Sequence, residues 1–213
     1  MPRKNRIRSS EFPYHISARC NNKDWFAIPL DEVWEIFSRY LYFITIAYGV
    51  EIHAFVLMNN HYHLILSTPK SNIEEAMCYL QRETSRCLGQ ASDRINHNFG
   101  GAYNACLITD LNYYSNVYKY ALRNPISAGI AQSVEEYAYS TLRGLLGFEH
   151  LSIPTFANEE LFISTERTLY WLNSPPRIDD NELIRKALKR REFQIKRCRK
   201  SGKKPSSEEF RIL

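Results

Sequence analysis

The chain has 213 residues, of which 44% are hydrophobic and 13% aromatic, so it can bury a core and is not a disordered chain. No apolar stretch reaches the roughly 20 residues of a membrane-spanning helix, and the basic start lacks the apolar segment of a secretory signal. The five cysteines are scattered without a Cys-x-x-Cys pair, which predicts reduced thiols in a cytoplasmic protein and gives no zinc finger.

The net charge of +5 is concentrated near the end of the sequence. Residues 185–204 hold eleven Lys or Arg and a single acid, Glu192, whereas the remainder carries a net charge of −5. Such a block attracts nucleic acid through phosphate contacts, although a solvated helix face explains the composition equally well. The candidate phosphate contacts are Arg185, Lys186, Lys189, Arg190, Arg191, Lys196, Arg197, Arg199 and Lys200.

Taken in chain order, apolar periodicity predicts a mixture of strands and helices before residue 150. The expected strands are residues 14–19, the two runs on either side of Asn59-Asn60 within 51–67, and residues 102–108. The expected helices run from Pro29 to before Gly49, from the capping box of Ser71 and Glu74 toward Leu88, and over residues 111–122.

This order of elements predicts an α+β fold, a ferredoxin-like sandwich whose mostly antiparallel sheet carries helices on one or both faces. We expect that fold to occupy residues 1–150. From about residue 151 the pattern changes, and residues 151–213 are expected to form a basic helical tail. Its helices are predicted at 159–172 and 181–199.

A predicted hairpin within residues 51–67 carries the first candidate site. Asn59-Asn60 suits a tight turn because asparagine tolerates positive φ. His61 and His63 would then lie on one strand face, about 6–7 Å apart along the chain, while Tyr62 points into the core. The pair indicates a metal site, but two surface histidines, or one core and one exposed histidine, fit the same pattern.

A second motif lies downstream, where Tyr120 and Asn124 are four residues apart at the end of a predicted helix, followed by Pro125. With His61-Tyr62-His63 upstream and Ala128-Gly129 downstream, the chain resembles the single-tyrosine HUH transposases. It is most similar to their REP-associated branch. The resemblance covers roughly residues 10–150. Asn59 stands where many relatives carry proline, and Tyr62 is larger than the common valine, but neither change removes a motif residue.

The resemblance implies a DNA transposase that cuts and rejoins single-stranded or hairpin DNA. Tyr120 would attack the phosphorus and form a 5′-phosphotyrosine. His61, His63 and Asn124 would hold a divalent ion, Mg²⁺ or Mn²⁺, of which manganese suits imidazole better. Relatives that make two cuts with one tyrosine commonly act as dimers, whereas REP-associated members can be monomeric, so the resemblance allows either a homodimer or a monomer.

Several alternatives stay open from the sequence alone. Tyr118 is a competing nucleophile, although it has no asparagine four residues on, and Tyr120 could be a core aromatic. His15 lies on the first strand, where a structural role is the simpler interpretation. The protein could be a catalytically silent, domesticated hairpin-binding module, or a metal-dependent hydrolase that uses water. The basic tail could bind DNA or cover the active site.

Overall fold

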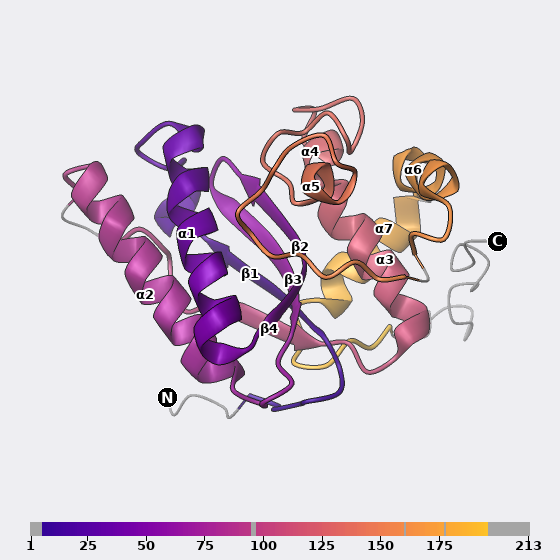
Figure 1. Cartoon of the computed structure of the whole chain (residues 1–213), viewed down its shortest axis with the longest axis horizontal. Coiled ribbons are helices and arrows are strands. Elements are labelled where there is room, and N and C mark those ends of the chain that lie inside the picture. The colour runs from indigo at the N-terminus through magenta and orange to yellow at the C-terminus, as the bar shows by residue number, and fades with distance from the viewer. Residues whose placement is uncertain (1–5, 95–96, 160, 177, 196–213) are drawn as a thin grey trace.

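The computed structural model describes residues 6–195 apart from 95–96, 160 and 177 (Figure 1). A four-stranded sheet lies at the centre, in the order β2-β3-β1-β4, and each neighbouring pair is antiparallel. The strands are β1 Tyr14–Arg19, β2 Glu51–Met58, β3 His61–Ser67 and β4 Asn104–Leu107. This order, with a helix after β1 and another after β3, confirms the predicted ferredoxin-like sandwich.

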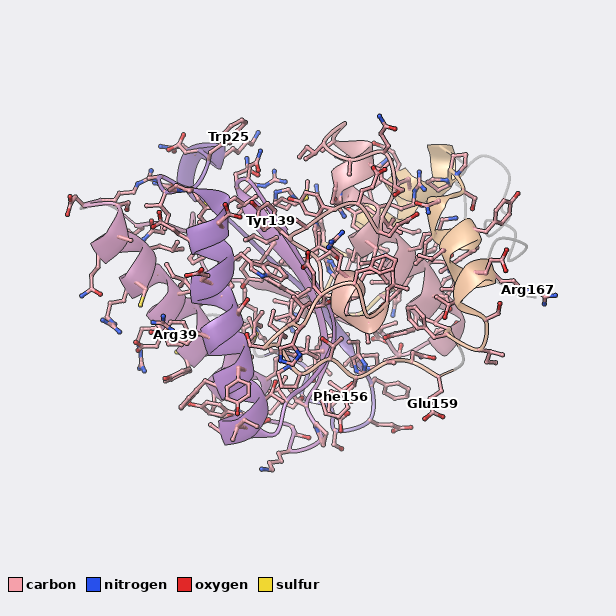
Figure 2. The ribbon with its side chains drawn as sticks, turned by 45° about the horizontal axis from the view of Figure 1, so that its top comes forward. Trp25, Arg39, Tyr139, Phe156, Glu159 and Arg167 are labelled. Atoms are coloured by element: carbon pink, nitrogen blue, oxygen red, sulfur yellow. The ribbon has the colours of Figure 1, made fainter. Side chains whose placement is uncertain are left out.

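Helices cover both faces of the sheet (Figure 1). The pair α1 and α2 packs on one face, and α3 with the later helices lies on the other. In Figure 2, Arg39 on α1 and Arg167 on α6 mark opposite sides of the molecule. The helices are α1 Leu30–Tyr48, α2 Ile73–Ala91, α3 Leu111–Leu122, α4 Asn124–Ser127, α5 Leu142–Leu145, α6 Thr165–Asn173 and α7 Ile178–Ala187, and η1 Asn21–Lys23 is a short 3-10 turn.

Alternation along the strands divides the buried side chains into two cores. On β3, Tyr62 and Leu64 enter the first core, which lies under α1 and α2, whereas Ile65 enters the second core, under α3. The first core includes Val33, Phe37, Leu41, Ile44, Met77 and Leu80. The second core includes Val56, Cys106, Val117, Tyr118, Ala121, Leu172, Ile184, Leu188 and Phe193. His61 and His63 therefore share the sheet face that α3 covers.

The ends of the first two helices test the local predictions. Helix α1 follows Pro29 and stops at Gly49, whose φ of 67° is the left-handed conformation that glycine adopts freely. The predicted capping box at Ser71 is wrong. Helix α2 begins at Ile73 with no side-chain cap at its N-terminus, and Glu74 forms an ion pair with Arg8 instead.

The tail is less helical than predicted. The expected helix at 159–172 is present only from Thr165, and the one expected at 181–199 is α7, which ends at Ala187. The described residues after Ala187 leave the helix because their backbone pairs with β4. The Leu107 amide donates to the Arg191 carbonyl at 2.7 Å, and the Phe193 amide donates to the Leu107 carbonyl at 2.8 Å. Free backbone groups at the edge of a sheet offer such partners.

Within the described part of the chain, we find no helix long and apolar enough to cross a membrane.

Candidate functional site

A cleft of about 930 Å³ lies between the sheet and α3, and its lining includes His61 and His63 of the first motif and Tyr120 and Asn124 of the second. The sheet contributes side chains from β1 and β3, and the helical side contributes the junction of α3 with α4. Helix α7 of the tail and the residues just after it complete the lining. The lining residues with polar chemistry include His15, Arg19, His61, His63, Asn104, Tyr120, Asn124, Arg185 and Lys189.

The two histidines of β3 lie side by side in this cleft, with ring centroids 5.1 Å apart. His61 is partly buried, and only 6% of His63 is exposed. Burial lowers the pKa of His61 to about 4 and the pKa of His63 well below its usual value, and the charge of Arg19 acts in the same direction on both. Both imidazoles are therefore neutral at neutral pH, which is the form that binds a metal ion.

Hydrogen bonds orient the His61 ring. The Asn60 amide group donates to the Lys23 carbonyl at 2.8 Å, which turns its oxygen toward His61. That oxygen lies 2.7 Å from Nδ1 of His61, so Nδ1 carries the proton and donates it. A neutral imidazole has one proton, and Nε2 of His61 therefore keeps the lone pair that could bind an ion.

The second histidine also has one ring nitrogen in a hydrogen bond and the other without a partner. Nδ1 of His63 lies 2.9 Å from Nε2 of His15, and Nε2 of His63 is buried without a hydrogen-bond partner. A buried nitrogen without a partner is costly unless a ligand satisfies it. Metal-binding histidines usually engage their other nitrogen in a hydrogen bond, and both histidines show this arrangement.

Tyr120 and Asn124 reach the same cleft from the end of α3. The ring centroids of Tyr120 and His63 are 5.7 Å apart. The Asn124 amide nitrogen donates to the Tyr120 carbonyl at 2.7 Å, which leaves the amide oxygen available. Hydrogen bonding to the Asn124 side chain opposes the lowering of the His63 pKa, so the amide oxygen lies beside that ring. The sequence prediction that Tyr120 and Asn124 project on one side of the helix end is consistent with this geometry.

Two opposing effects act on the Tyr120 phenol. Burial raises its pKa, whereas the charges of Arg185 and Arg19 lower it. Tyr118 differs, because only 1% of it is exposed, it belongs to the second core, and burial raises its pKa well above the usual value. Of the two tyrosines, Tyr120 is the one that lines the cleft.

The donor set fits a divalent ion. Among the described residues, no three His, Cys, Asp or Glu side chains are grouped to hold a metal. The unpartnered Nε2 of His63, the Nε2 of His61 and the amide oxygen of Asn124 instead offer two nitrogens and one neutral oxygen. Such a set suits Mn²⁺ or another ion that accepts imidazole, and it leaves the positive charge of the ion uncompensated.

The basic residues of the tail lie in different surroundings, and only some of them border the cleft. Arg185 and Lys189 line the cleft, and Arg185 shares the carboxylate of Glu182 with Lys186. Arg190 donates to a backbone carbonyl in the turn after α7, and Arg191 is exposed. The remaining candidates, Lys196, Arg197, Arg199 and Lys200, lie outside the described residues.

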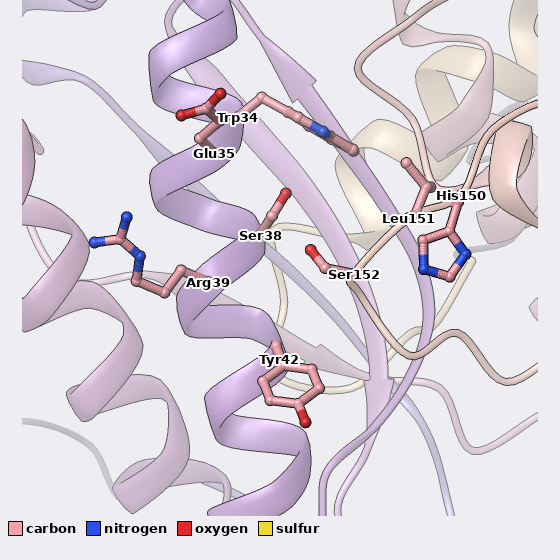
Figure 3. Close-up of a pocket in the computed structure, with 8 residues that line it drawn as sticks. All are labelled: Trp34, Glu35, Ser38, Arg39, Tyr42, His150, Leu151 and Ser152. Carbon is pink, nitrogen blue, oxygen red and sulfur yellow. The ribbon is translucent and has the colours of Figure 1, made fainter.

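A second cavity, of about 450 Å³, lies between α1 and residues 150–152 (Figure 3). His150 and Ser38 are among its lining residues, which also include Trp34 and Tyr42. This cavity offers a single imidazole and a largely apolar wall. It lacks the grouping of nitrogens, phenol and amide that the first cleft presents.

Comparison with solved structures shows a shared fold. The structure of a REP-associated tyrosine transposase bound to a REP hairpin superposes with a TM-score of 0.59 and 14% sequence identity, covering 74% of this chain and 92% of that chain. A crystal structure from Deinococcus radiodurans R1, described as a transposase, gives a TM-score of 0.37 at 18% identity, over 56% of this chain and 92% of that one. No protein of curated function matches the chain.

The sequence also matches a family model, that of the IS200-like transposases, over residues 9–122. This range is more than half of the chain and includes β1 to β4 and α3, with both histidines of β3 and Tyr120. The chain therefore belongs to the family of IS200-like transposases.

Proposed function

We propose that this transposase cuts and rejoins single-stranded or hairpin DNA through a covalent bond to Tyr120, with a divalent ion held by His61, His63 and Asn124. One observation carries the proposal. The Tyr120 ring lies 5.7 Å from the His63 ring, whose Nε2 is buried and has no partner. A nucleophile and a vacant nitrogen ligand thus meet in one cleft.

The ion, when bound, would polarise a phosphodiester oxygen and stabilise the charge that develops during displacement. The chain's own residues prepare the site for it. Hydrogen bonds at Nδ1 direct the lone pair of His61 into the cleft, and the bond from the Asn124 amide nitrogen turns its oxygen the same way. Because these ligands are neutral, they do not repel the phosphate.

In the proposed cleavage, the Tyr120 oxygen forms a bond to phosphorus and the bond between phosphorus and the 3′-oxygen breaks. The phenol loses its proton, and the leaving 3′-oxygen gains one. The product is a 5′-phosphotyrosine and a free 3′-hydroxyl. Attack by a 3′-hydroxyl on the phosphotyrosine reverses these changes and joins two strands without a nucleotide cofactor.

The cations around Tyr120 support its role as a nucleophile. A phenol with a pKa near ~10 is mostly protonated at neutral pH, so deprotonation needs help. Arg19 and Arg185 favour the phenolate, in opposition to burial. The same two guanidinium groups are suited to the phosphate of a substrate strand.

Single-stranded or hairpin DNA is the substrate that we infer. The REP-associated transposase of the same fold is described as bound to a REP hairpin. In this chain, we assign the nucleophile and the metal ligands to residues 1–150 and phosphate contacts to the basic tail of 151–213. Arg185 and Lys189 support the second assignment, because they border the cleft.

The decisive experiment is cleavage of a labelled single-stranded hairpin DNA in the presence of Mn²⁺, followed on a denaturing protein gel. The wild type should give a covalent protein–DNA band, and Tyr120→Phe should give neither the band nor a cut strand. Tyr118→Phe is the matched control, since it makes the same change on the same helix and removes a hydroxyl that has no hydrogen-bond partner. It should retain the band.

Other outcomes would identify the alternative functions. Cleavage that persists in Tyr120→Phe would refute the tyrosine mechanism and indicate a hydrolase that uses water. Tight hairpin binding without cleavage by the wild type, across several hairpin sequences, would indicate a catalytically silent binding module. Loss of the band in Tyr118→Phe, with an unchanged melting temperature, would assign the nucleophile to Tyr118.

A further inference from the structure

We propose that His15 is a positioning residue for the metal site. Its Nε2 accepts a hydrogen bond from the Nδ1–H group of His63, which leaves the lone pair on Nε2 of His63 and directs it into the cleft. This inference rests on the proposed function, because it assigns a role in holding the ion. His15 is 48 positions from His63 in the chain and lies outside both sequence motifs.

The contact is direct and buried. Nε2 of His15 lies 2.9 Å from Nδ1 of His63, and the two residues are 1% and 6% exposed. The side chains come from β1 and β3, which are paired in the sheet, so the backbone holds both rings on the face that α3 covers. The His15 ring also lies 6.3 Å from the Tyr120 ring, between centroids. His15 therefore touches a candidate ligand and borders the candidate nucleophile.

The proton positions of the pair decide whether His63 can bind an ion. Each neutral ring carries one proton. If Nδ1 of His63 is the donor, then Nε2 of His15 accepts, and Nε2 of His63 has a free lone pair. If Nε2 of His15 is the donor, the proton of His63 lies on its Nε2 and blocks the ion. Only the first arrangement is competent to bind metal, and it needs an acceptor at the position of His15 Nε2.

Packing alone does not explain an imidazole at this position. Nδ1 of His15 is buried without a hydrogen-bond partner, which costs stability that an apolar side chain would not lose. The cross-strand neighbours of His15 are Ile65 and Cys106, both fully buried. By contrast, the partly buried His53 of β2 has its Nε2 bonded to the Ser67 hydroxyl at 2.8 Å. A polar group kept at this cost in an apolar setting points to a task at the cleft.

The test measures Mn²⁺ affinity by calorimetry without DNA. His15→Phe removes the acceptor and should weaken Mn²⁺ binding by about 10- to 100-fold, the usual cost of losing such a supporting partner. His15→Gln places an amide oxygen at similar reach and should keep the affinity within about threefold of the wild type, by the same reasoning. His53→Phe is the matched control, because it removes a histidine from the same sheet outside the cleft, and it should leave the affinity unchanged.

A second readout does not depend on how the variants fold. In wild-type protein labelled with ¹⁵N-histidine and loaded with diamagnetic Zn²⁺, both His15 and His63 should carry their protons on Nδ1. A proton on Nε2 of His15 would overturn the inference, as would equal Mn²⁺ affinity in wild type and His15→Phe. If the wild type binds neither ion, the proposed metal site itself is refuted, and the role of His15 falls with it.

Discussion

The buried histidines should make the metal-free protein sensitive to mild acid. Burial lowers the pKa of His15 to about 3 and of His61 to about 4, and it lowers the pKa of His63 well below its usual value. In the unfolded chain each would titrate near ~6.5. Between these values the unfolded chain binds protons that the folded protein excludes. Stability is therefore full above pH ~6.5 and declines as the pH falls through this window.

The size of the loss follows from the unfolded pKa. The value pH 5 lies about 1.5 units below the pKa of an unfolded histidine. At about 1.36 kcal/mol per unit, each histidine that stays neutral in the fold lowers the free energy of unfolding by about 2 kcal/mol. This figure holds for any folded pKa well below 5. His15, His61 and His63 together give about 6 kcal/mol, and His53, whose pKa burial also lowers, adds to this loss. Domains are typically stable by only about 5–15 kcal/mol, so the effect is large.

Urea denaturation followed by circular dichroism, with a chelator present, measures this loss at pH 7.5 and at pH 5. Carboxylates with ordinary pKa values near ~4 remain mostly ionised at both, so histidines dominate the difference. His15→Gln should reduce the pH dependence by about 2 kcal/mol, since it removes one such group. A difference below about 1 kcal/mol in the wild type would refute the reasoning that these rings are buried in the neutral form.

Three further predictions concern the helices and the tail. Arg123→Met should lower the free energy of unfolding by about 2–4 kcal/mol, because the guanidinium donates to two carbonyls at the end of α6; urea denaturation measures it, and a loss below about 1 kcal/mol contradicts it. Replacing Arg185 and Lys189 together by Gln should reduce the slope of log affinity for hairpin DNA against log salt by about 1.4–1.8. Arg39→Gln, on α1 and therefore on the other face of the sheet from the cleft, should leave that slope unchanged, and equal slopes in all variants would exclude phosphate contacts at the cleft. Gly144→Ala should lower the free energy of unfolding by about 1–3 kcal/mol, because the added Cβ would lie 2.8 Å from Cδ1 of the Leu151 side chain. An unchanged melting temperature would contradict this.

The sheet and the main helices could be predicted because local patterns determine them. The strand expected at 14–19 and the helix expected at 111–122 have the same bounds in the structure. In both, the apolar side chains recur with the period of the element and are buried in a core. Asn59-Asn60 forms the two-residue turn of the hairpin, and His61 and His63 share a face as expected. The reason given for the turn is wrong, because neither asparagine adopts a positive φ.

Contacts between distant residues could not be read from such patterns. The approach of His15 to His63 depends on the register between β1 and β3, although alternation on β1 does separate His15 from its core-facing neighbours. Similarly, α7 ends early because the backbone near Arg191 pairs with β4, far earlier in the chain. Basic composition favoured a longer helix, but the free edge of the sheet provides the stronger alternative for the backbone.

The packing of the tail decides how its role can be tested. Ile184, Leu188 and Phe193 are buried in the second core, against the same helix that carries Tyr120. A deletion after residue 176 would remove these side chains together with the basic residues. Loss of cleavage in that deletion would then follow from a displaced α3 as readily as from lost phosphate contacts. Lys189→Gln changes the charge at the cleft and leaves the core in place. It also spares Arg185, whose charge acts on the Tyr120 phenol, so it separates DNA binding by the tail from the part of the tail in positioning the nucleophile.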